Sequence, residues 1–205
     1  MVFFAALLTF WNWAVRDMSA YDAFRQSTFN AVAVLSTTGF HTNDYDSWGG
    51  FAEVVFFMMA FVGGCTGSTA GGIKVFRYEV LFANAGAHLK RLLHPHGVFV
   101  IDFNGQMVSE QVVRSVLSFV ALYFFCFALL ALGLTMTGLD AVTGLSGAAA
   151  AISNMGPGLG PLIGPGGSYH DLSNPAKWLF TFGMLLGRLE LAPLIILITP
   201  AFWRR

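Results

Sequence analysis

Long apolar runs alternate with shorter ones along the chain. A helix that crosses a bilayer needs about 20 predominantly apolar residues. Residues 112–137 and 174–203 reach that length, and residues 1–15 would make most of a third span. Residues 51–62 are also apolar, but at about 1.5 Å per residue they give only half a span. Because lipid cannot satisfy backbone polar groups, spans of this kind predict an all-α membrane protein.

The short run at 51–62 leads into a glycine-rich segment. Residues 63–72 contain five glycines, and that density does not sustain a regular helix. A helical pattern resumes over 73–87, so we predict one second span, 51–87, that is broken in its middle. A basic, amphipathic segment at 81–93 predicts a cytoplasmic helix, either along the inner membrane surface or in an ordinary loop.

Two further helical segments, 23–36 and 140–153, are apolar but too short to span. Each begins near an aspartate that can cap a helix, Asp22 or Asp140. Each ends in a stretch that contains glycine. Short helices flanked by polar turns are typical of re-entrant segments, which enter and leave the membrane on one side. We therefore interpret both as pore helices.

The two halves of the chain share one layout: span, short helix, glycine turn, span. This divides the chain into a repeat at 1–97, with a clipped first span, and a second repeat at 98–205. Internal repeats with short or glycine-broken segments indicate a transport pathway. The matching positions are Asp22-Ala23-Phe24 with Asp140-Ala141-Val142, Ser36-x-x-Gly39 with Ser153-x-x-Gly156, and Phe56 and Gly63 with Phe180 and Gly187.

Composition agrees with a lipid-facing surface. The chain is 56% hydrophobic and 11% charged, whereas soluble domains carry about 25% charged residues. Its formal net charge of zero gives no footprint for nucleic acid. Cys65 and Cys126 stand in apolar or glycine-rich sequence and read as packing residues, and the histidines form no ligand pattern. No catalytic constellation is present, so we do not expect an enzyme.

Charge also predicts an orientation. Cytoplasmic loops are enriched in Lys and Arg, so the basic side is predicted to be cytoplasmic and the glycine turns enter from outside. Acidic residues on the outer side would enrich cations there. The basic set is Lys74, Arg77, Lys90, Arg91, Arg204 and Arg205. The outer set is Arg16, Arg25 and Lys177 with Asp17, Asp22, Asp44, Asp46, Glu53 and Asp171.

The two glycine turns have the properties of a potassium filter. Such a filter replaces the hydration shell with backbone carbonyl oxygens, and glycine permits the dihedral angles that this requires. The pore helices would aim their negative C-terminal dipole ends at the ion path. The alternative is a pair of plain turns between helices. The predicted filter residues are Ser36, Thr37, Thr38, Gly39 and Phe40 in the first turn, and Ser153, Asn154, Met155 and Gly156 in the second.

The glycine-rich break predicts a gate. Irregular backbone at membrane depth is tolerated only where it lines protein or water, and a flexible glycine loop in a conduction path can move at little cost. A phosphate-binding loop is excluded by spacing, because Ile73 precedes Lys74 and Val75 follows it. The predicted gate residues of the loop are Gly63, Gly64, Gly67, Ser68, Thr69, Gly71 and Gly72.

Arg188 is predicted to belong to this gate. An arginine in mid-span is costly unless it faces a partner or a wet cavity, and the repeat aligns Arg188 with Gly64. We expect Arg188 to hydrogen-bond carbonyls of the glycine-rich loop and hold it shut. The alternative is a structural pair with an acidic residue. Glu190, two positions away, would point elsewhere on a helix.

Together these motifs resemble the C-terminal half of a TrkH/KtrB-type potassium transporter membrane subunit, over essentially the whole chain. The resemblance implies four span–pore loop–span repeats around one pore, of which this chain holds the third and fourth. The carrying motifs are the run Ser36-Thr37-Thr38-Gly39-Phe40, the run from Gly63 to Lys74, Asn154-Met155-Gly156-Pro157-Gly158, Gly187-Arg188-Leu189-Glu190, and the closing Thr199-Pro200-Ala201-Phe202-Trp203.

The resemblance also implies roles and partners. Gly39 and Gly156 would be filter glycines, and residues 63–72 a gating loop just below the filter. Potassium would be the transported ion, with no covalently bound cofactor. The protein would be a multi-pass protein of a prokaryotic inner or plasma membrane. The full-length protein would form a homodimer and bind a cytoplasmic, nucleotide-sensing regulatory subunit of the TrkA/KtrA type.

The sequence departs from the family in holding two repeats out of four, so we expect a fragment of a longer protein. Three other readings stay open: a secondary transporter of a small solute with a discontinuous helix, a sodium-permeable member of the same family, and a non-transporting assembly subunit. A solute transporter would need polar groups at the midplane, and only Arg188 and Glu190 meet that requirement.

Overall fold

The computed structural model describes residues 1–94, 97, 99, 102–103, 106–190 and 203. These residues are mostly helical, with one short hairpin. In chain order the elements are α1 (Val2–Ala14), α2 (Ala20–Leu35), the 3-10 helix η1 (Tyr45–Trp48), α3 (Gly50–Phe61), α4 (Val75–Leu93), β1 (Asp102–Phe103) antiparallel to β2 (Gln106–Met107), α5 (Glu110–Met136), α6 (Ala141–Ser153), η2 (Tyr169–Asp171) and α7 (Asn174–Arg188).

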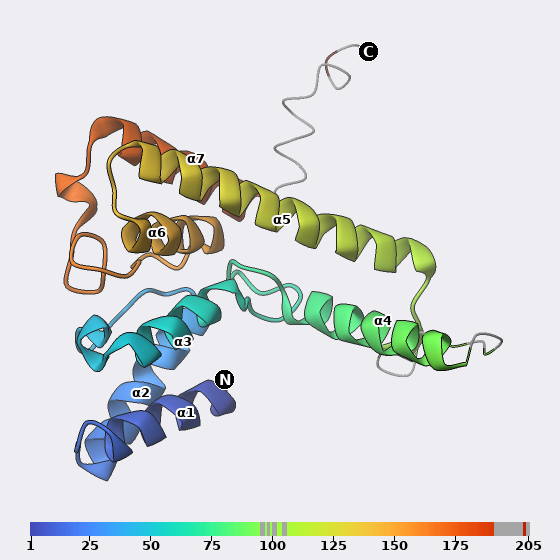
Figure 1. Ribbon diagram of the computed structural model, residues 1–205, viewed down its shortest axis with the longest axis horizontal. Coiled ribbons are helices and arrows are strands. Elements are labelled where there is room, and N and C mark those ends of the chain that lie inside the picture. The colour runs from blue at the N-terminus through green and yellow to red at the C-terminus, as the bar shows by residue number, and fades with distance from the viewer. Residues whose placement is uncertain (95–96, 98, 100–101, 104–105, 191–202, 204–205) are drawn as a thin grey trace.

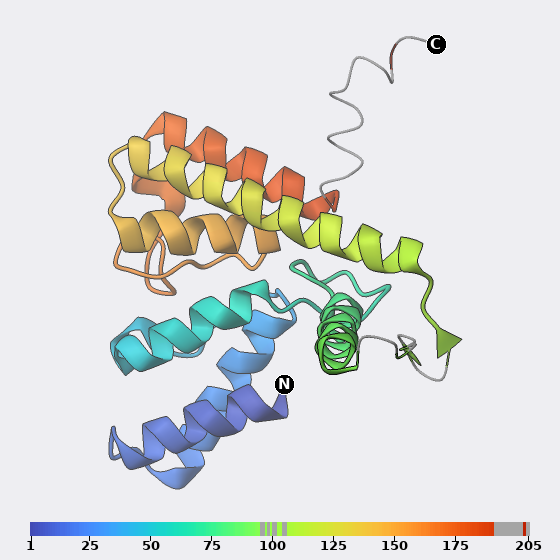
Figure 2. The same ribbon diagram turned by 45° about the vertical axis from the view of Figure 1, so that its right-hand side comes forward.

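The helices form two groups that meet at α6. One group holds α1, α2 and α3, and the other holds α5, α6 and α7 (Figures 1 and 2). α6 packs against α5 and α7 on one side and against α3 on the other. α4 extends away from both groups and packs along α5. The N-terminal and C-terminal halves therefore touch through α3 and α6, and again through α4 and α5.

α5 has the length and surface of a membrane span. Among the described residues it is the one helix both long and apolar enough to cross a bilayer, and only 22% of its most apolar window is buried. Phe125 and Leu132 are exposed, which suits a lipid-facing helix because lipid tails are as apolar as these side chains. The helices α1, α3 and α6 are apolar but shorter.

Both short helices begin with a side-chain cap, although not in the same way. Asp140 caps α6 as expected, since its carboxylate accepts the Thr143 N–H at 3.1 Å. Asp22 is not the cap of α2. Ser19 takes that position: its hydroxyl accepts the Asp22 N–H at 3.1 Å and donates to the Asp22 carboxylate at 2.8 Å. This serine cap starts α2 three residues earlier than the aspartate alone predicted.

The predicted break between two helices is present, with different limits. α3 ends at Phe61 and α4 begins at Val75, so residues 62–74 form the break, called the glycine-rich loop below. α4 then continues without interruption to Leu93. The prediction that the span ends at 87 was therefore wrong, and so was the prediction of a separate helix at 81–93. Val80 and Ala87 are buried along this helix, which favours continuity. Residues 191–202 of the predicted span 174–203 lie outside the described residues.

Small side chains allow α6 its central place. Ala148, Ala149, Ala150 and Ala151 are at most 1% exposed, and such residues let neighbouring backbones approach closely. One core cluster joins Met59 of α3 to residues of α6. A second cluster packs Phe180 of α7 against residues of α5 and α6. The ends of the two short helices are therefore fixed on a shared core.

Candidate functional site

The first turn (residues 36–40) folds back onto the end of α2. The N–H groups of Thr38 and Gly39 point to the Ala33 carbonyl, at 3.0 Å and 3.4 Å. Thr37 has φ +55° and Gly39 has φ +72°. A left-handed residue followed by a bond back over five positions is the usual way to end a helix, and only glycine adopts φ > 0 without strain.

The second turn (residues 153–158) has the same backbone pattern. The Met155 N–H donates to the Ala150 carbonyl at 3.0 Å, again over five positions. Asn154 has φ +54° and Gly156 has φ +104°. Thr37 and Asn154 each follow the matching serine by one position, and Gly39 and Gly156 follow it by three. The backbone thus repeats where the sequence motif repeats.

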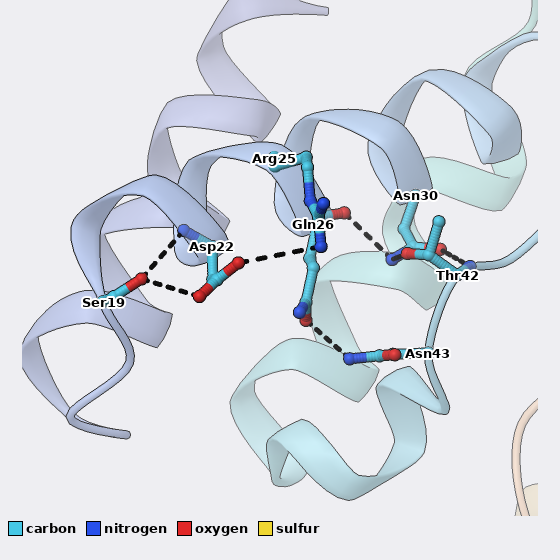
Figure 3. A network of polar contacts seen from close by, with 7 residues as sticks. All are labelled: Ser19, Asp22, Arg25, Gln26, Asn30, Thr42 and Asn43. Atoms are coloured by element: carbon cyan, nitrogen blue, oxygen red, sulfur yellow. Dashed lines mark hydrogen bonds and ion pairs between the residues drawn. The ribbon is translucent and has the colours of Figure 1, made fainter.

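A polar network holds the chain that leaves the first turn (Figure 3). Asn30 of α2 is fully buried. Its amide donates to the Thr42 hydroxyl at 3.2 Å, and its side-chain oxygen accepts the Thr42 N–H at 3.2 Å. Asn43 donates to the Gln26 side chain at 2.7 Å. These bonds tie the segment after the first turn back along α2, so the turn is anchored on both sides.

The second turn is anchored in a comparable way by one buried serine. The Ser146 hydroxyl of α6 accepts the Leu159 N–H at 3.0 Å and donates to the Leu159 carbonyl at 3.2 Å. Thr42 and Leu159 each lie three positions beyond the turn glycine. In both halves a polar side chain of the short helix therefore forms hydrogen bonds with the backbone of the segment that follows the turn.

The two turns lie against each other. A β-carbon added to Gly39 would stand 2.6 Å from the Met155 carbonyl oxygen and 3.1 Å from Pro157 Cδ. A β-carbon on Gly156 would meet the Gly39 Cα at 3.9 Å. The structure therefore brings together the two glycines that the sequence singled out, and at Gly39 it leaves no room for a side chain.

On the side that was predicted to face outward, Asp46 links the two halves. Its carboxylate accepts the Gly160 N–H at 2.8 Å, joining η1 to the segment after the second turn. Burial raises the pKa of Asp46 to about 6, with the nearby carboxylates Asp44 and Glu53 adding to the rise. At neutral pH this carboxyl is mostly ionised and can accept the bond.

Tyr169 is a neighbour of the second turn that the sequence analysis missed. Its hydroxyl donates to the Gly156 carbonyl at 2.6 Å, and its ring packs edge-on against Phe180 at 5.0 Å. The bond fixes the direction of one carbonyl that was predicted to line the filter. No local signal in the sequence marks this tyrosine, because the contact arises only when the segment folds back to start α7.

The glycine-rich loop is closed at its base by backbone bonds. Val62 and Ile73 form a parallel bridge. The Gly63 N–H donates to the Ile73 carbonyl at 2.8 Å, and the Ile73 N–H donates to the Phe61 carbonyl at 3.0 Å. A β-carbon on Gly63 would collide with the Gly71 carbonyl oxygen. The glycines thus let the two stems of the loop come close enough to form backbone hydrogen bonds with each other.

Lys74 fills the inside of this loop, which the sequence analysis did not predict. It is 7% exposed. Its ammonium group donates to the Ser68 carbonyl at 2.8 Å and also to the Ala70 carbonyl, with the Ser68 hydroxyl at 3.4 Å. The N–H groups of the Lys74 ammonium, which a phosphate would need as donors, are thus bonded to carbonyl oxygens of the loop. This agrees with the rejection of a phosphate-binding loop.

The loop lies directly against the ends of both short helices. A β-carbon on Gly71 would collide with the Ser153 carbonyl oxygen, and the Gly71 N–H donates to the Thr37 hydroxyl at 3.3 Å. From the other half, the Arg188 guanidinium donates to the Thr69 carbonyl at 2.8 Å. Arg188 therefore meets a loop carbonyl, as expected, although at Thr69 rather than beside Gly64. No ion pair of Arg188 is formed among the described residues.

Comparison with known proteins shows the family of the chain. The whole chain, residues 1–205, matches the family model TrkH, described as a cation transport protein. The chain belongs to the TrkH family. The resemblance drawn from the sequence is thereby confirmed, and so is the expectation that the chain is not an enzyme, since the TrkH family consists of cation transporters. Family membership also makes it a protein of the cell membrane.

Individual relatives show the extent of the match. The chain is 46% identical over 198 residues to the Trk system potassium uptake protein TrkI of Halomonas elongata, covering 97% of this chain and 40% of that protein. It is 41% identical over 186 residues to TrkH of Vibrio parahaemolyticus, covering 91% and 38%. The crystal structure of that potassium transporter superposes with a TM-score of 0.91 at 38% identity, covering 99% of this chain and 43% of the other. The chain thus spans about 40% of these relatives.

Proposed function

We propose that this chain forms half of a pore for potassium uptake, with the two turns as filter loops and the glycine-rich loop as the gate below them. The names of the TrkI and TrkH relatives support potassium uptake. The observation that carries the proposal is the position of the glycine-rich loop: it contacts Thr37 of the first turn and Ser153 at the end of α6, next to the place where the two turns meet.

Carbonyl oxygens of residues 36–40 and 153–156 would take the place of water around the ion. Dehydrating a cation is favourable only when several oxygens replace its shell, and two turns supply half of a ring. α2 and α6 both end at these turns, so their negative C-terminal ends add to the attraction for a cation. The same geometry would serve a sodium-permeable member of the family, so the ion preference is tested below.

The glycine-rich loop would close the path by occupying it. Its stems are bonded to each other at Gly63 and Ile73, while its tip is held by two cations, Lys74 from the same half and Arg188 from the other. Opening then requires loss of the bond between Arg188 and Thr69, because Lys74 moves with the loop. The hydrogen bond from Arg188 to Thr69 is the contact that a conformational change would break to open the loop.

The proposed setting follows the family. The protein would lie in the inner or plasma membrane of a bacterium, with lipid around α5. The full-length protein would form a homodimer. A cytoplasmic, nucleotide-sensing subunit of the TrkA/KtrA type would regulate it from the basic side, where α4 ends with Lys90 and Arg91.

Experiments on the pore need a chain with all repeats. We define the chimaera as Halomonas elongata TrkI in which residues 1–205 of this chain replace the matching segment. The identity of 46% over that segment makes correct packing against the remaining repeats the expected outcome. Flux is measured in cells without other potassium uptake systems.

Gly39→Ser is expected to lower the preference of the chimaera for potassium over sodium by about tenfold, the ratio that corresponds to roughly 1.4 kcal/mol. Gly39 has φ +72°, and its β-carbon would stand 2.6 Å from the Met155 carbonyl oxygen, so a side chain must displace a predicted filter carbonyl. At Gly156, with φ +104°, an added β-carbon makes only an ordinary contact, 3.9 Å from the Gly39 Cα, so Gly156→Ser should have a smaller effect. Competition between the two ions in flux assays measures both.

Gly138→Ser is the matched control for these two substitutions. Gly138 also has positive φ, +93°, and open space around its β-carbon, but it lies in the turn after α5. It should leave the ion preference unchanged. If neither Gly39→Ser nor Gly156→Ser alters selectivity while potassium still flows, the turns are not the filter.

Arg188→Ala is expected to raise cation flux about tenfold, because a hydrogen bond to a charged group is worth roughly 1.5–3 kcal/mol and only the closed loop has it. The Thr69 carbonyl loses its partner in the other half, and the loop is released. Steady-state potassium and sodium leak in the chimaera gives the measurement, with membrane-inserted protein quantified alongside.

Arg114→Ala provides the control for removing an arginine. Arg114 is paired with Glu110, four positions before it in α5, and its side chain is 76% exposed. It forms no part of the proposed gate. It should change neither flux nor expression. A loss of folded protein in Arg188→Ala, without any leak, would instead show that Arg188 supports the fold and does not hold a gate.

A further inference from the structure

An ion pair close to the glycine-rich loop joins the two halves of the chain. The Arg77 guanidinium lies 3.1 Å from the Glu190 carboxylate. The other ion pairs among the described residues join partners within four positions, whereas these two are 113 apart. Arg77 lies in the first turn of α4, and Glu190 lies just beyond the end of α7. The pair therefore ties the start of α4 to the end of α7.

Arg77 is the fixed partner of this pair. Its guanidinium carbon stands 3.7 Å from the centre of the Phe119 ring of α5, and its side chain is 14% exposed. The Glu190 side chain is 53% exposed. A cation over an aromatic ring is attracted to the ring face, so α5 holds Arg77 in place. Glu190, and with it the end of α7, is drawn to that fixed point.

The ion pair lies next to both cations that hold the loop. Lys74 is three residues before Arg77 and donates to Ser68, while Arg188 is two residues before Glu190 and donates to Thr69. Their side chains, together with Glu190, line a cavity of about 130 Å³ between the loop and the end of α7. Arg188 reaches Thr69 only while the end of α7 stays close to the start of α4, and the Arg77–Glu190 contact sets that separation.

We propose that Arg77 and Glu190 form a latch, a positioning pair that holds the end of α7 against α4 so that Arg188 keeps the loop closed. This rests on the proposed gate and assigns its regulation to α4. α4 runs from Arg77 to Lys90 and Arg91 at the basic side. A displacement of α4 would separate Arg77 from Glu190, withdraw Arg188 from Thr69 and free the loop.

Charge-neutral and charge-reversed variants of the chimaera test the latch. Arg77→Gln and Glu190→Gln should each raise cation flux about fivefold, within the range of typical coupling between sites. Both should also speed hydrogen–deuterium exchange in the peptide 62–74, where the amides of Gly63, Gly71 and Ile73 are bonded in the closed loop. Arg77→Glu combined with Glu190→Arg should slow exchange and lower flux part of the way toward the parent, because the ion pair re-forms but the contact of a cation with the Phe119 ring is lost.

Arg114→Gln is the control, since Arg114 pairs with Glu110 at 2.7 Å within α5 and does not touch the loop. It should change neither readout. Parent-like flux and exchange in both Gln variants would overturn the latch, as would a reversed pair as leaky as the single variants. If the Gln variants do not fold, the reversed pair decides alone: slow exchange supports the latch and fast exchange overturns it.

The outcome also separates the latch from the gate. Faster exchange that the reversed pair corrects, with flux unchanged throughout, would support a latch that holds the loop while removing the role of the loop as a gate. Unchanged exchange and flux in the Gln variants, combined with higher flux in Arg188→Ala, would leave the gate in place and overturn the latch.

Discussion

Deleting residues 65–70 from the chimaera should raise cation flux at least about tenfold. A closed state favoured by a few kcal/mol leaves only about 0.1–10% of molecules open. The deletion removes Ser68, Thr69 and Ala70, which are the acceptors for Lys74 and Arg188. The stem bonds between Gly63 and Ile73 lie outside the deleted segment and can still form. If the loop is the proposed gate, the deletion removes the obstruction and keeps the stems that frame it.

A replacement of the same six residues separates obstruction from flexibility. Exchanging residues 65–70 for six glycine and serine residues keeps the length and the backbone carbonyls that Lys74 and Arg188 bind. This variant should conduct about as little as the parent. Flux is measured as potassium uptake per inserted protein. If the deletion lowers flux while the protein still reaches the membrane, the loop supports the structure and does not close the pore.

The interruption of the second span could be read from the sequence because its cause is local. Five glycines in residues 63–72 exclude a regular helix in any fold. The same holds for the turns: Ser36-x-x-Gly39 and Ser153-x-x-Gly156 end two short apolar helices, and the structure gives both the same backbone pattern. That these turns act as a filter stays a prediction.

Contacts between distant residues could not be read in this way. Lys74 follows a glycine run, and without the closed loop nothing distinguishes it from a solvent-exposed cation of the inner side. Tyr169 meets Gly156 only because the chain folds back before α7, and Arg77 meets Glu190 across 113 positions. The placement of Arg188 near the loop followed from the repeat alignment, but its acceptor, Thr69, depends on the shape of the loop tip.

Helix limits failed where capping or length competed with the pattern. Asp22 looked like a cap, but Ser19 precedes it and forms the reciprocal pair with it. The basic residues at the end of α4 suggested a separate surface helix. In the structure they complete one helix that begins at Val75. Lys90 and Arg91 lie in its last turn, where positive charge stabilises the negative C-terminal end of the helix dipole.

The 205-residue chain alone should give no potassium uptake, whereas the chimaera should give full uptake. Two turns cannot surround a dehydrated ion. Their open side would also leave backbone groups facing lipid, and each unsatisfied group costs several kcal/mol. A second copy of the chain would offer four turns but would place the later repeats where the earlier ones belong. The glycine-rich loop has no glycine-rich counterpart around Gly187, so such a ring would be mismatched.

Growth of cells without potassium uptake systems at low potassium tests this most directly. Three cultures are compared: the chain alone, the chimaera, and the chimaera carrying Gly39→Ser, each with its membrane content quantified. The proposal that residues 1–205 complete a potassium pore predicts growth with the chimaera, growth impaired by sodium with Gly39→Ser, and none with the chain alone. Growth with the chain alone, or a chimaera that inserts normally and takes up no potassium, would contradict it.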